Sequence, residues 1–386
     1  MRQGRSAYSS ANGFLEKTAS KENFKSSNFM ELTLDFATNS SNRTAARRLN
    51  RIRRESAGIS PTTFRNTVER EGAAMQGQIE RKCGEALDGG GFVWNGEAYE
   101  TETFAPDAPK HIMQAEIESA AIELNIESYE AADYELPGAA VNVSVDEVCV
   151  KRQTETRPKN EEKQQARRIE NTVLHVQHKN KSYVLNAASL VSGVKLLLGF
   201  LLLNGLLGKQ IVVFADGART IHAAVLRMLC FANVKIILDW YHLHKKCKEN
   251  LSMALAGSKT RNEFLDVLMP CLWHGNVERA ICLLEGIDPK KVKNQDYIRI
   301  LIDYFQRVRG FIPRYALRKR LGLRNSSNAG EKANDLVVSS RQKHNGMSWS
   351  NKGSASFASV ASASHNRETL NWVHNQQIRF ELQSAA

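Results

Sequence analysis

The chain has 386 residues, of which 42% are hydrophobic and 24% charged, and its 53 Lys and Arg against 41 Asp and Glu give a net charge of +12. This length and composition exclude a disordered tail and a disulfide-stapled miniprotein, and they predict two or three domains with real cores. The charge is uneven: residues 1–70 carry a net +7, residues 71–140 a net −12 and residues 141–386 a net +17. Clustered Lys and Arg side chains bind phosphates, so the basic ends favour a polyanionic partner.

The cysteines and the apolar stretches bear on the cellular compartment. The six cysteines form no Cys-x-x-Cys pair, and no apolar run follows the first residues. We therefore expect a reducing, cytoplasmic setting without a signal peptide. The longest apolar stretch, Val191 to Leu207, is interrupted by Lys195 and Asn204, so we expect a buried helix there and no membrane span.

Two basic helices are predicted near the N-terminus, after residues 1–30, which we expect to be disordered. Asn42 can cap a helix that extends to about residue 55, with Leu49 and Ile52 on its apolar face. Ser60, followed by proline, then caps a second helix. Two short helices joined by a glycine-containing turn predict a helix-turn-helix over residues 31–72, with a plain basic helical hairpin as the alternative. The predicted DNA contacts on these helices are Arg43, Arg47, Arg48, Arg51, Arg54, Thr62, Thr63, Arg65 and Asn66.

Residues 73–140 are acidic, and we expect an acidic linker with a small helical module near Met113–Leu124. The three glycines Gly89–Gly91 are not followed by Lys-Ser or Lys-Thr, and Gly208-Lys209-Gln210 does not complete a phosphate-binding loop. A nucleotide-hydrolysing site is therefore not expected.

From residue 141 onwards the hydrophobic pattern predicts alternating strands and helices. Residues 141–150 alternate with period two, residues 151–168 should loop out, and further strands are predicted at 172–177, 182–186, 211–214 and 234–238. With helices after the third and fourth strands, the order is β-β-β-α-β-α-β, the layout of the RNase H-like fold. We expect an α/β domain over residues 141–350 with a mixed five-stranded sheet, an all-helical insertion over about 242–325, and a C-terminal tail or helix over 351–386.

Three carboxylates could form a metal site. Asp146 lies inside the first strand and Asp216 ends the fourth, so these two would meet if those strands are adjacent. Glu331 begins the last predicted helix, over residues 331–344. Carboxylates gathered in this way suit Mg²⁺ and a two-metal phosphodiester chemistry. Each has a structural alternative: an outward-facing strand residue, an Asp-Gly turn, and a capping box between Asn328 and Glu331.

A zinc site is a second possibility. Cys230, His242, His244 and Cys247 offer thiolate and imidazole ligands. However, Cys230 precedes the fifth predicted strand while the other three follow it, and the spacing matches no usual zinc module.

Four motifs in order resemble those of prokaryotic insertion-sequence transposases of the DDE type, in the RNase H-like, retroviral-integrase superfamily. The resemblance covers about residues 141–373, with a weaker likeness near 43–72. The motifs are Val143-Ser-Val-Asp146, Val213-Phe-Ala-Asp-Gly-Ala218, Ile237-Leu-Asp-Trp-Tyr-His-Leu-His-Lys-Lys-Cys247, and Glu331-x-x-Asn334 followed by Val337-Val-x-x-Arg341-Gln-Lys343-x-x-Gly346-Met-x-Trp349-Ser350.

This resemblance implies a function and a set of residues. It implies Asp146, Asp216 and Glu331 as the catalytic, metal-binding triad, with Mg²⁺ as cofactor and Mn²⁺ as its substitute. Asp239, His242 and Asn334 would support the triad. Further contacts with the DNA backbone are expected from Arg341 and Lys343 and from the basic faces near Lys245, Lys246, Lys248 and Arg314–Arg320.

The implied activity is cleavage at the ends of a DNA element followed by strand transfer. The partners would be double-stranded DNA, as element ends and as target, and further copies of the chain in a synaptic complex, with no membrane, in the cytoplasm at the nucleoid. The family has Gly-Ser-Gly before its glutamate, where this chain has Ser326-Ser-Asn328. A decayed copy that only binds DNA and a structure-specific nuclease on the same fold are the alternatives.

Overall fold

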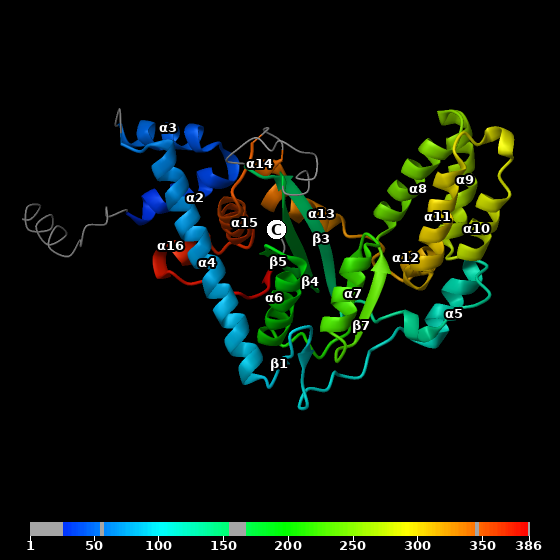
Figure 1. Cartoon of the computed structure of the whole chain (residues 1–386). Helices are drawn as coiled ribbons and strands as arrows, with labels where there is room; N and C mark the ends of the chain where they lie inside the picture. The colour runs from blue at the N-terminus through cyan, green and yellow to red at the C-terminus, as the bar shows by residue number, and fades with distance from the viewer. Residues whose placement is uncertain (1–25, 55–57, 154–166, 344–346, 385–386) are drawn as a thin grey trace, which may run out of the picture.

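A mixed six-stranded sheet forms the centre of the molecule, with helices on both faces (Figure 1). The computed structural model describes residues 26–54, 58–153, 167–343 and 347–384. The strands lie side by side in the order β7-β6-β3-β4-β5-β8. Their bounds are β3 (Val141–Lys151), β4 (Arg168–His178), β5 (Lys181–Ala187), β6 (Ile211–Ala215), β7 (Val234–Leu238) and β8 (Gln383–Ser384).

The five predicted strands are all present in a mixed sheet, and the first and fourth of them, β3 and β6, are neighbours. β3, β4 and β5 pair antiparallel, and β6 then pairs parallel to β3, with Ser144 opposite Phe214. β7 continues the parallel part beside β6. Residues 211–215 are buried throughout, as expected of a parallel strand that is covered on both faces. The sequence did not predict β8, which pairs with Lys181 and Ser182 of β5 and makes the sheet six-stranded.

Different helices cover the two faces of the sheet. On one face, α6 and α7 pack against β3 to β6, and the buried α6 is the helix expected from the apolar stretch. On the other face, α13 and α15 lie over β3 to β5, while the insertion helices lie over β6 and β7. The bounds are α6 (Leu190–Leu203), α7 (Arg219–Met228), α13 (Asn328–Asn334), η6 (Asp335–Ser339), α14 (Ser340–Gln342), α15 (Asn351–His365) and α16 (Thr369–Asn375).

The all-helical insertion is present between β7 and α13. Its helices are α8 (Trp240–Ala254), α9 (Ser258–Trp273), α10 (Val277–Glu285), η4 (Pro289–Lys291), α11 (Gln295–Val308), η5 (Arg309–Phe311) and α12 (Tyr315–Arg320). The two ends of the insertion meet, because the Trp240 amide donates to the Asn325 carbonyl at 3.1 Å. The helices share one core with Phe214 and Leu238 of the sheet, which fixes the insertion to β6 and β7.

The N-terminal helices are α2 (Ser27–Asn39), α3 (Asn42–Arg53) and α4 (Pro61–Gly89). The disorder expected over 1–30 falls mostly outside the described residues, and residues 27–30 are helical. Ser41, not Asn42, caps α3, and Ile52 is 54% exposed, so both of those details of the prediction are wrong. Ser60 caps α4 as predicted.

The second helix of the predicted helix-turn-helix is much longer than expected. α4 continues 17 residues beyond Gly72, so the boundary placed at residue 72 falls inside a continuous helix. α4 crosses from α15 to α6, where Gly72 meets the Ser356 backbone and Cys83 meets Gly199. Figure 1 shows α2 and α3 beside the upper end of α4, away from the sheet.

The acidic connector contains β1 (Val93–Trp94), β2 (Tyr99–Glu100), α5 (Gln114–Glu123) and η1 (Ala131–Asp133). The predicted helical module is α5, which packs against Leu317 and Leu321. Acidic side chains of the connector bind basic ones elsewhere. Glu135 forms a fully buried pair with Arg318, Glu123 pairs with Arg320, and Asp133 pairs with Lys235. The connector is thus bound along its length to the insertion and to β7.

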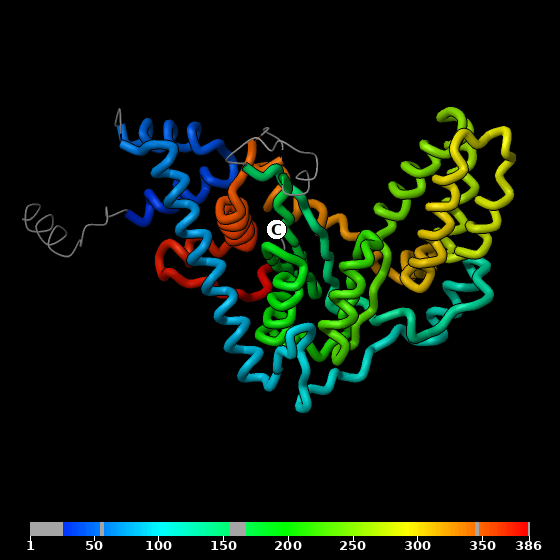
Figure 2. Tube along the Cα trace, viewed as in Figure 1, coloured from blue at the N-terminus to red at the C-terminus, as the bar shows by residue number. Residues whose placement is uncertain are grey.

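The C-terminal residues belong to the core. Beyond the predicted helix, which is α15, the chain forms α16 and β8 and buries Ile378 and Phe380. Tyr183, Phe200 and Phe380 make one aromatic cluster with ring centroids 4.8 to 5.6 Å apart. Among the described residues, no helix has both the length and the apolar composition needed to span a membrane. Figure 2 follows the chain from the N-terminal helices through the sheet and the insertion back to the C-terminal segment, coloured red, between α4 and the sheet.

Candidate functional site

Asp146 and Asp216 come from two neighbouring strands of the sheet, β3 and β6. Asp146 lies near the middle of β3, and Asp216 directly follows β6, which pairs with β3. Asp216 Oδ1 accepts a 2.9 Å hydrogen bond from the Ala218 amide, as in an Asp-Gly turn. The parallel pairing of β3 and β6 therefore fulfils the condition for the two acids to meet, and it brings both carboxylates to one region.

Glu331 reaches the same region because α13 packs unusually close to β3. A Cβ on Gly330 would lie 2.4 Å from the Ser144 Cβ, so only glycine allows this approach. One turn after Gly330, Asn334 Nδ2 donates a short hydrogen bond to Asp146 Oδ2. A turn of π-helix, η6, follows directly, a feature often found near functional sites.

The capping-box alternative for Glu331 is wrong. Asn328 is the first helical residue of α13, and the cap is Ser327, which makes no side-chain hydrogen bond to the helix. Asn328 instead accepts from the Ser326 hydroxyl at 3.0 Å. The Glu331 side chain is free of a capping role and extends towards α8.

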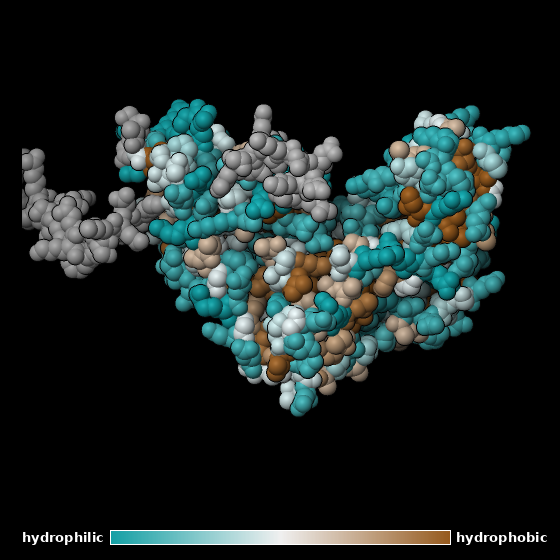
Figure 3. Space-filling model, viewed as in Figure 1, coloured by the Kyte–Doolittle hydropathy of each residue, from teal (hydrophilic) through white to brown (hydrophobic). Residues whose placement is uncertain are grey.

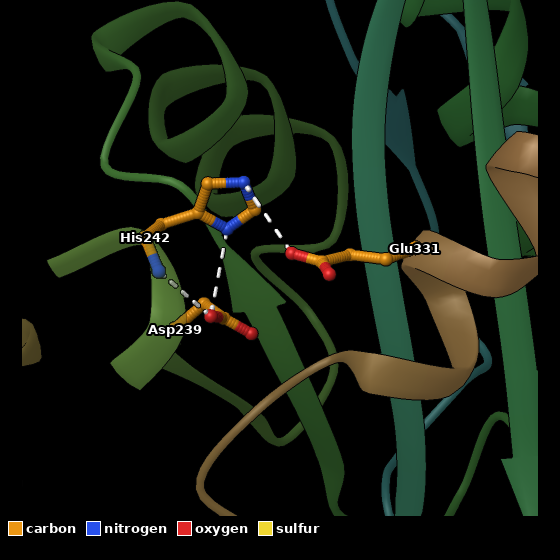
Figure 4. Close-up of side chains that lie close together, drawn as sticks. All are labelled: Asp239, His242 and Glu331. Atoms are coloured by element: carbon orange, nitrogen blue, oxygen red, sulfur yellow. Dashed lines mark hydrogen bonds and ion pairs between the residues drawn. The ribbon is translucent and has the colours of Figure 1, made fainter. Parts of the chain in front are cut away.

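Glu331 meets His242 and Asp239, as Figure 4 shows. His242 lies between the two carboxylates: its Nδ1 is 3.5 Å from Asp239 Oδ1, and its Nε2 is 3.8 Å from Glu331 Oε1. At these distances the contacts are charge interactions, and Nδ1 has no hydrogen-bond partner of good geometry. Asp239 and His242 were predicted to support the site, and the structure places both within it.

Asp239 has a clear structural role. It follows β7 and caps α8, because its Oδ1 accepts from the His242 amide at 3.1 Å. Its Oδ2 accepts from the Ser327 amide, which precedes α13. One carboxylate that is only 1% exposed thus joins the starts of the two helices that carry His242 and Glu331.

The charges of the site shift one another's ionisation. Burial raises the pKa of Asp146, against the lowering effects of His242 and the Asn334 hydrogen bond, and the Asp216 charge raises it further. Burial also raises the pKa of Glu331, with Asp239 and Asp146 adding to the effect. The Asp239 carboxylate raises the pKa of His242 despite burial. For Asp239 itself, burial acts to raise the pKa, but hydrogen bonds from His242 and Ser327 outweigh it and lower the value.

Asp239, His242 and Glu331 could hold a metal ion. Each offers one ligand atom, and these atoms all lie within 4.8 Å of one another. Among the described residues, the ligand atoms of this group lie this close together, and those of the predicted triad Asp146, Asp216 and Glu331 do not. The reason is that each acid faces another partner: Asn334 binds Asp146, the Ala218 amide binds Asp216, and His242 faces Glu331.

The predicted zinc alternative is not assembled in the described part of the chain. Cys247 is fully buried in the insertion core, whereas Cys230 is exposed. The pKa of the Cys247 thiol is raised by burial, which disfavours the thiolate that zinc requires. His242 instead belongs to the carboxylate group.

The predicted DNA contacts of the N-terminal helices lie on the surface. Arg43, Arg47, Arg51 and Arg54 are exposed on or just after α3, and Thr62, Thr63, Arg65 and Asn66 are exposed in the first turns of α4. Arg48 is exposed as well, although it donates to the Ser40 hydroxyl at 2.9 Å. Lys343 is exposed after α14.

The prediction that Arg341 contacts the DNA backbone is wrong, because this side chain is only 5% exposed. Its guanidinium donates to the Ala37 carbonyl and to Asn42 Oδ1, and it lies 5.0 Å from the Trp349 ring centroid. The basic face expected at Arg314–Arg320 is also largely occupied. Arg318 and Arg320 pair with acids of the connector, and Arg314 donates to the His274 carbonyl.

Sequence reasoning missed several residues around the site. Gly330 allows the close approach of α13, and the Ser327 amide binds Asp239. Tyr304 and Arg307 of α11 bind the carbonyls of Asp216 and Gly217. The last two lie far along the chain in a helical insertion, where periodicity predicts burial and gives no sign of a contact with the sheet.

Comparison with known proteins adds no family to these observations. No protein-family model matches the chain, and no curated protein matches it significantly.

Proposed function

We propose that the protein is a DNA transposase of the DDE type, which binds the ends of a DNA element, cuts a phosphodiester there and transfers the resulting 3′-OH to a target. The observation that carries the proposal is the approach of Asp146, Asp216 and Glu331 from two paired strands and one closely packed helix. The strand order, with the helical insertion between β7 and α13, is the arrangement expected of an RNase H-like catalytic domain. A net charge of +12 suits a polyanionic substrate.

The residues of the site fit a divalent metal ion. Asp146, Asp216 and Glu331 offer the carboxylate oxygen ligands that Mg²⁺ and Mn²⁺ prefer. His242 lies beside Glu331, and its imidazole is a ligand better suited to softer metals. Asp146, Asp216 and Glu331 would hold the ion. When bound, Mg²⁺ would activate the attacking oxygen and stabilise the leaving oxygen of the phosphodiester.

The surrounding residues would position the acids. Asn334 fixes the Asp146 carboxylate, and Asp239 fixes the two helix starts. The Asp239 carboxylate raises the pKa of His242, which favours the protonated imidazole beside Glu331. The Ser326-Ser-Asn328 stretch, where the family has Gly-Ser-Gly, still approaches the site through the Ser327 amide.

The N-terminal helices and the end of β3 would hold the DNA. The exposed arginines of α3 and the exposed first turns of α4 would meet phosphates and base edges. Lys151, Arg167, Arg168 and Lys343 line one pocket of about 630 Å³ at the end of β3. This basic pocket would bind the DNA backbone on its way from the carboxylates.

The test is an assay of cleavage and joining. Purified protein is incubated with duplexes carrying the sequences that flank the coding region, with and without Mg²⁺, and the products are examined for 3′-OH ends and joined strands. Asp146→Asn, Asp216→Asn and Glu331→Gln should each lower cleavage by at least about 100-fold while leaving end binding intact.

Glu147→Gln is the matched control, because Glu147 is the next residue on β3 and faces the opposite side of the sheet. This variant should cleave normally. Near-normal cleavage by any of the three site variants would remove that residue from the triad. End binding without metal-dependent cleavage would indicate a DNA-binding protein, and cleavage without joining a nuclease.

A further inference from the structure

A second pocket lies beside Asp216, on the side of the insertion. It has a volume of about 310 Å³ and is lined by the turn after β6 and by α8 and α11. In Figure 3 the surface is hollowed between the insertion helices and the central body. Because Asp216 belongs to this pocket and to the proposed metal site, a group bound here lies next to the reacting phosphate.

One face of α8 lines the pocket with polar side chains. His242, Lys245, Lys246 and Glu249 are at positions i, i+3, i+4 and i+7, and all four line the pocket. The opposite face of α8, with Cys247, is buried in the insertion core. The core therefore fixes which side chains of α8 point at Asp216.

Helix α11 adds Tyr304 and Arg307. Arg307 Nη1 donates to the Gly217 carbonyl at 2.9 Å, and the buried Tyr304 hydroxyl donates to the Asp216 carbonyl at 3.5 Å. Two cations lie near the Tyr304 ring: Arg307 Cζ is 5.3 Å and Lys246 Nζ 5.9 Å from its centroid. The ring and the carbonyl thus hold the cations beside the turn.

The pocket has more positive than negative charge. Asp216 and Glu249 are its acids, against Lys245, Lys246 and Arg307, with His242 close to Asp239 and Glu331. Over the described ranges, neither these two lysines nor Arg307 takes part in an ion pair. Unpaired Lys and Arg side chains around a concave surface favour a phosphate group.

We infer that this pocket, built on Lys246, Tyr304 and Arg307, binds the DNA phosphate adjacent to the one that is cut. The inference rests on the proposed function and adds to it a second phosphate subsite, supplied by the insertion. Lys246 and Arg307 supply the charge, and Tyr304 keeps both cations in place. The insertion therefore contributes to holding the strand at the cleavage point.

The experiment combines a protein variant with a neutralised substrate. End duplexes carry one uncharged methylphosphonate at either phosphate adjacent to the cleavage position, and cleavage rates are measured in Mg²⁺. For the wild type, one of the two substitutions should slow cleavage by about tenfold or more. Lys246→Gln should slow cleavage of the unmodified duplex by a similar factor. For this variant, the same methylphosphonate substitution should lower the cleavage rate only slightly further.

Lys259→Gln is the matched control, because Lys259 is exposed on α9 and does not line the pocket. In this variant the methylphosphonate should slow cleavage by the same factor as in the wild type. Arg307→Gln should behave as Lys246→Gln does. The inference would be overturned if the methylphosphonate slowed cleavage by the wild-type factor in both Lys246→Gln and Arg307→Gln. The effects of these substitutions on cleavage would then be independent of that phosphate.

A binding measurement separates this inference from the proposed function. In Ca²⁺ without cleavage, the salt dependence of end-duplex affinity should decrease in slope by about one for Lys246→Gln. Glu249→Gln should bind more tightly, because an acid is removed from the pocket. If the wild type cuts no DNA but these shifts occur, the pocket is supported and the catalytic proposal fails. If neither binding shift occurs, the pocket assignment fails, whether or not cleavage is observed.

Discussion

Burial decides the role of individual charged residues in this molecule. Arg341 resembles a DNA-contacting arginine in the sequence, but it is enclosed between α2, α3 and two aromatic rings. Burial lowers the pKa of Arg341 to about 10, and the guanidinium is satisfied by a carbonyl, an amide oxygen and the rings. It therefore connects the N-terminal helices to the segment that follows Glu331. Asp239 shows the same principle, since its buried carboxylate caps one helix and binds the start of another.

The effect of burial on His175 of β4 can be tested through the pH dependence of protein stability. Burial lowers its pKa from 6.5 to about 4, with His365 and Arg324 adding to the effect. The unfolded chain therefore binds a proton that the folded chain excludes between these values. His175 contributes stability that is fully present above pH 6.5 and is lost as pH falls towards 4, by up to about 3 kcal/mol.

The measurement is the free energy of unfolding in denaturant at pH 7 and at pH 4.5, for the wild type and for His175→Gln. The variant should lose less stability on acidification than the wild type. His178, His222 and His365 also have pKa values lowered by burial, so the wild type keeps part of its acid sensitivity in either case. Equal losses in the two proteins would show that His175 titrates normally when folded.

At the scale of elements, glycines set how closely helices approach their neighbours. Gly330 brings α13 onto β3, and Gly193 lies against Leu174 and Thr172 on the other face. Gly72 marks the crossing of α4 and α15, where an added Cβ would lie 2.1 Å from the Ser356 carbonyl oxygen. The Ser356 backbone cannot move aside as a flexible side chain can, so the crossing of α4 and α15 depends on glycine.

Two glycines of the same helix should therefore respond oppositely to alanine. Gly72→Ala should destabilise the protein by about 1–3 kcal/mol, because α4 must move away from α15. Gly84→Ala has no atom within 4 Å of the new Cβ and should stabilise by about 0.5–1 kcal/mol through helix propensity. Denaturant midpoints of both variants decide this, and a stabilising Gly72→Ala would disprove the close crossing.

At the scale of the whole molecule, the N-terminal helices and the sheet share one core. Leu34, Leu49 and Phe64 belong to the same hydrophobic cluster as the strands and α15. The Trp372 Nε1 atom of α16 donates to Glu71 of α4 at 3.1 Å. The DNA-binding helices proposed for this chain are thus part of the fold that carries the carboxylates, and not a separate unit on a linker.

A chain that begins at residue 73 should consequently fail to fold cooperatively. It lacks α2, α3 and the first part of α4, which uncovers apolar surface on α15. Near-UV circular dichroism and limited proteolysis should show loss of fixed packing relative to the full chain under identical conditions. A cooperative unfolding transition at the temperature of the full chain would instead support an independent domain boundary at residue 72.

The positions of the five main strands, the buried leucine-rich helix, the insertion and the acids at strand ends were predictable from the sequence alone. These follow from local patterns: alternation on β3, continuous apolar runs on β6 and β7, and acids at strand ends. The Ser60 cap was also predictable from the sequence, because capping depends on a few adjacent residues.

The sequence did not predict which charged residues are accessible to a partner or how the helices pack together. The burial of Arg341, the pairing of Arg318 with Glu135, the length of α4 through the shared core and the approach of Tyr304 and Arg307 to Asp216 all depend on contacts between distant segments. A local sequence pattern indicates only whether a side chain is charged or apolar. Whether that side chain faces solvent, a carboxylate or a backbone carbonyl depends on which surfaces the fold brings together.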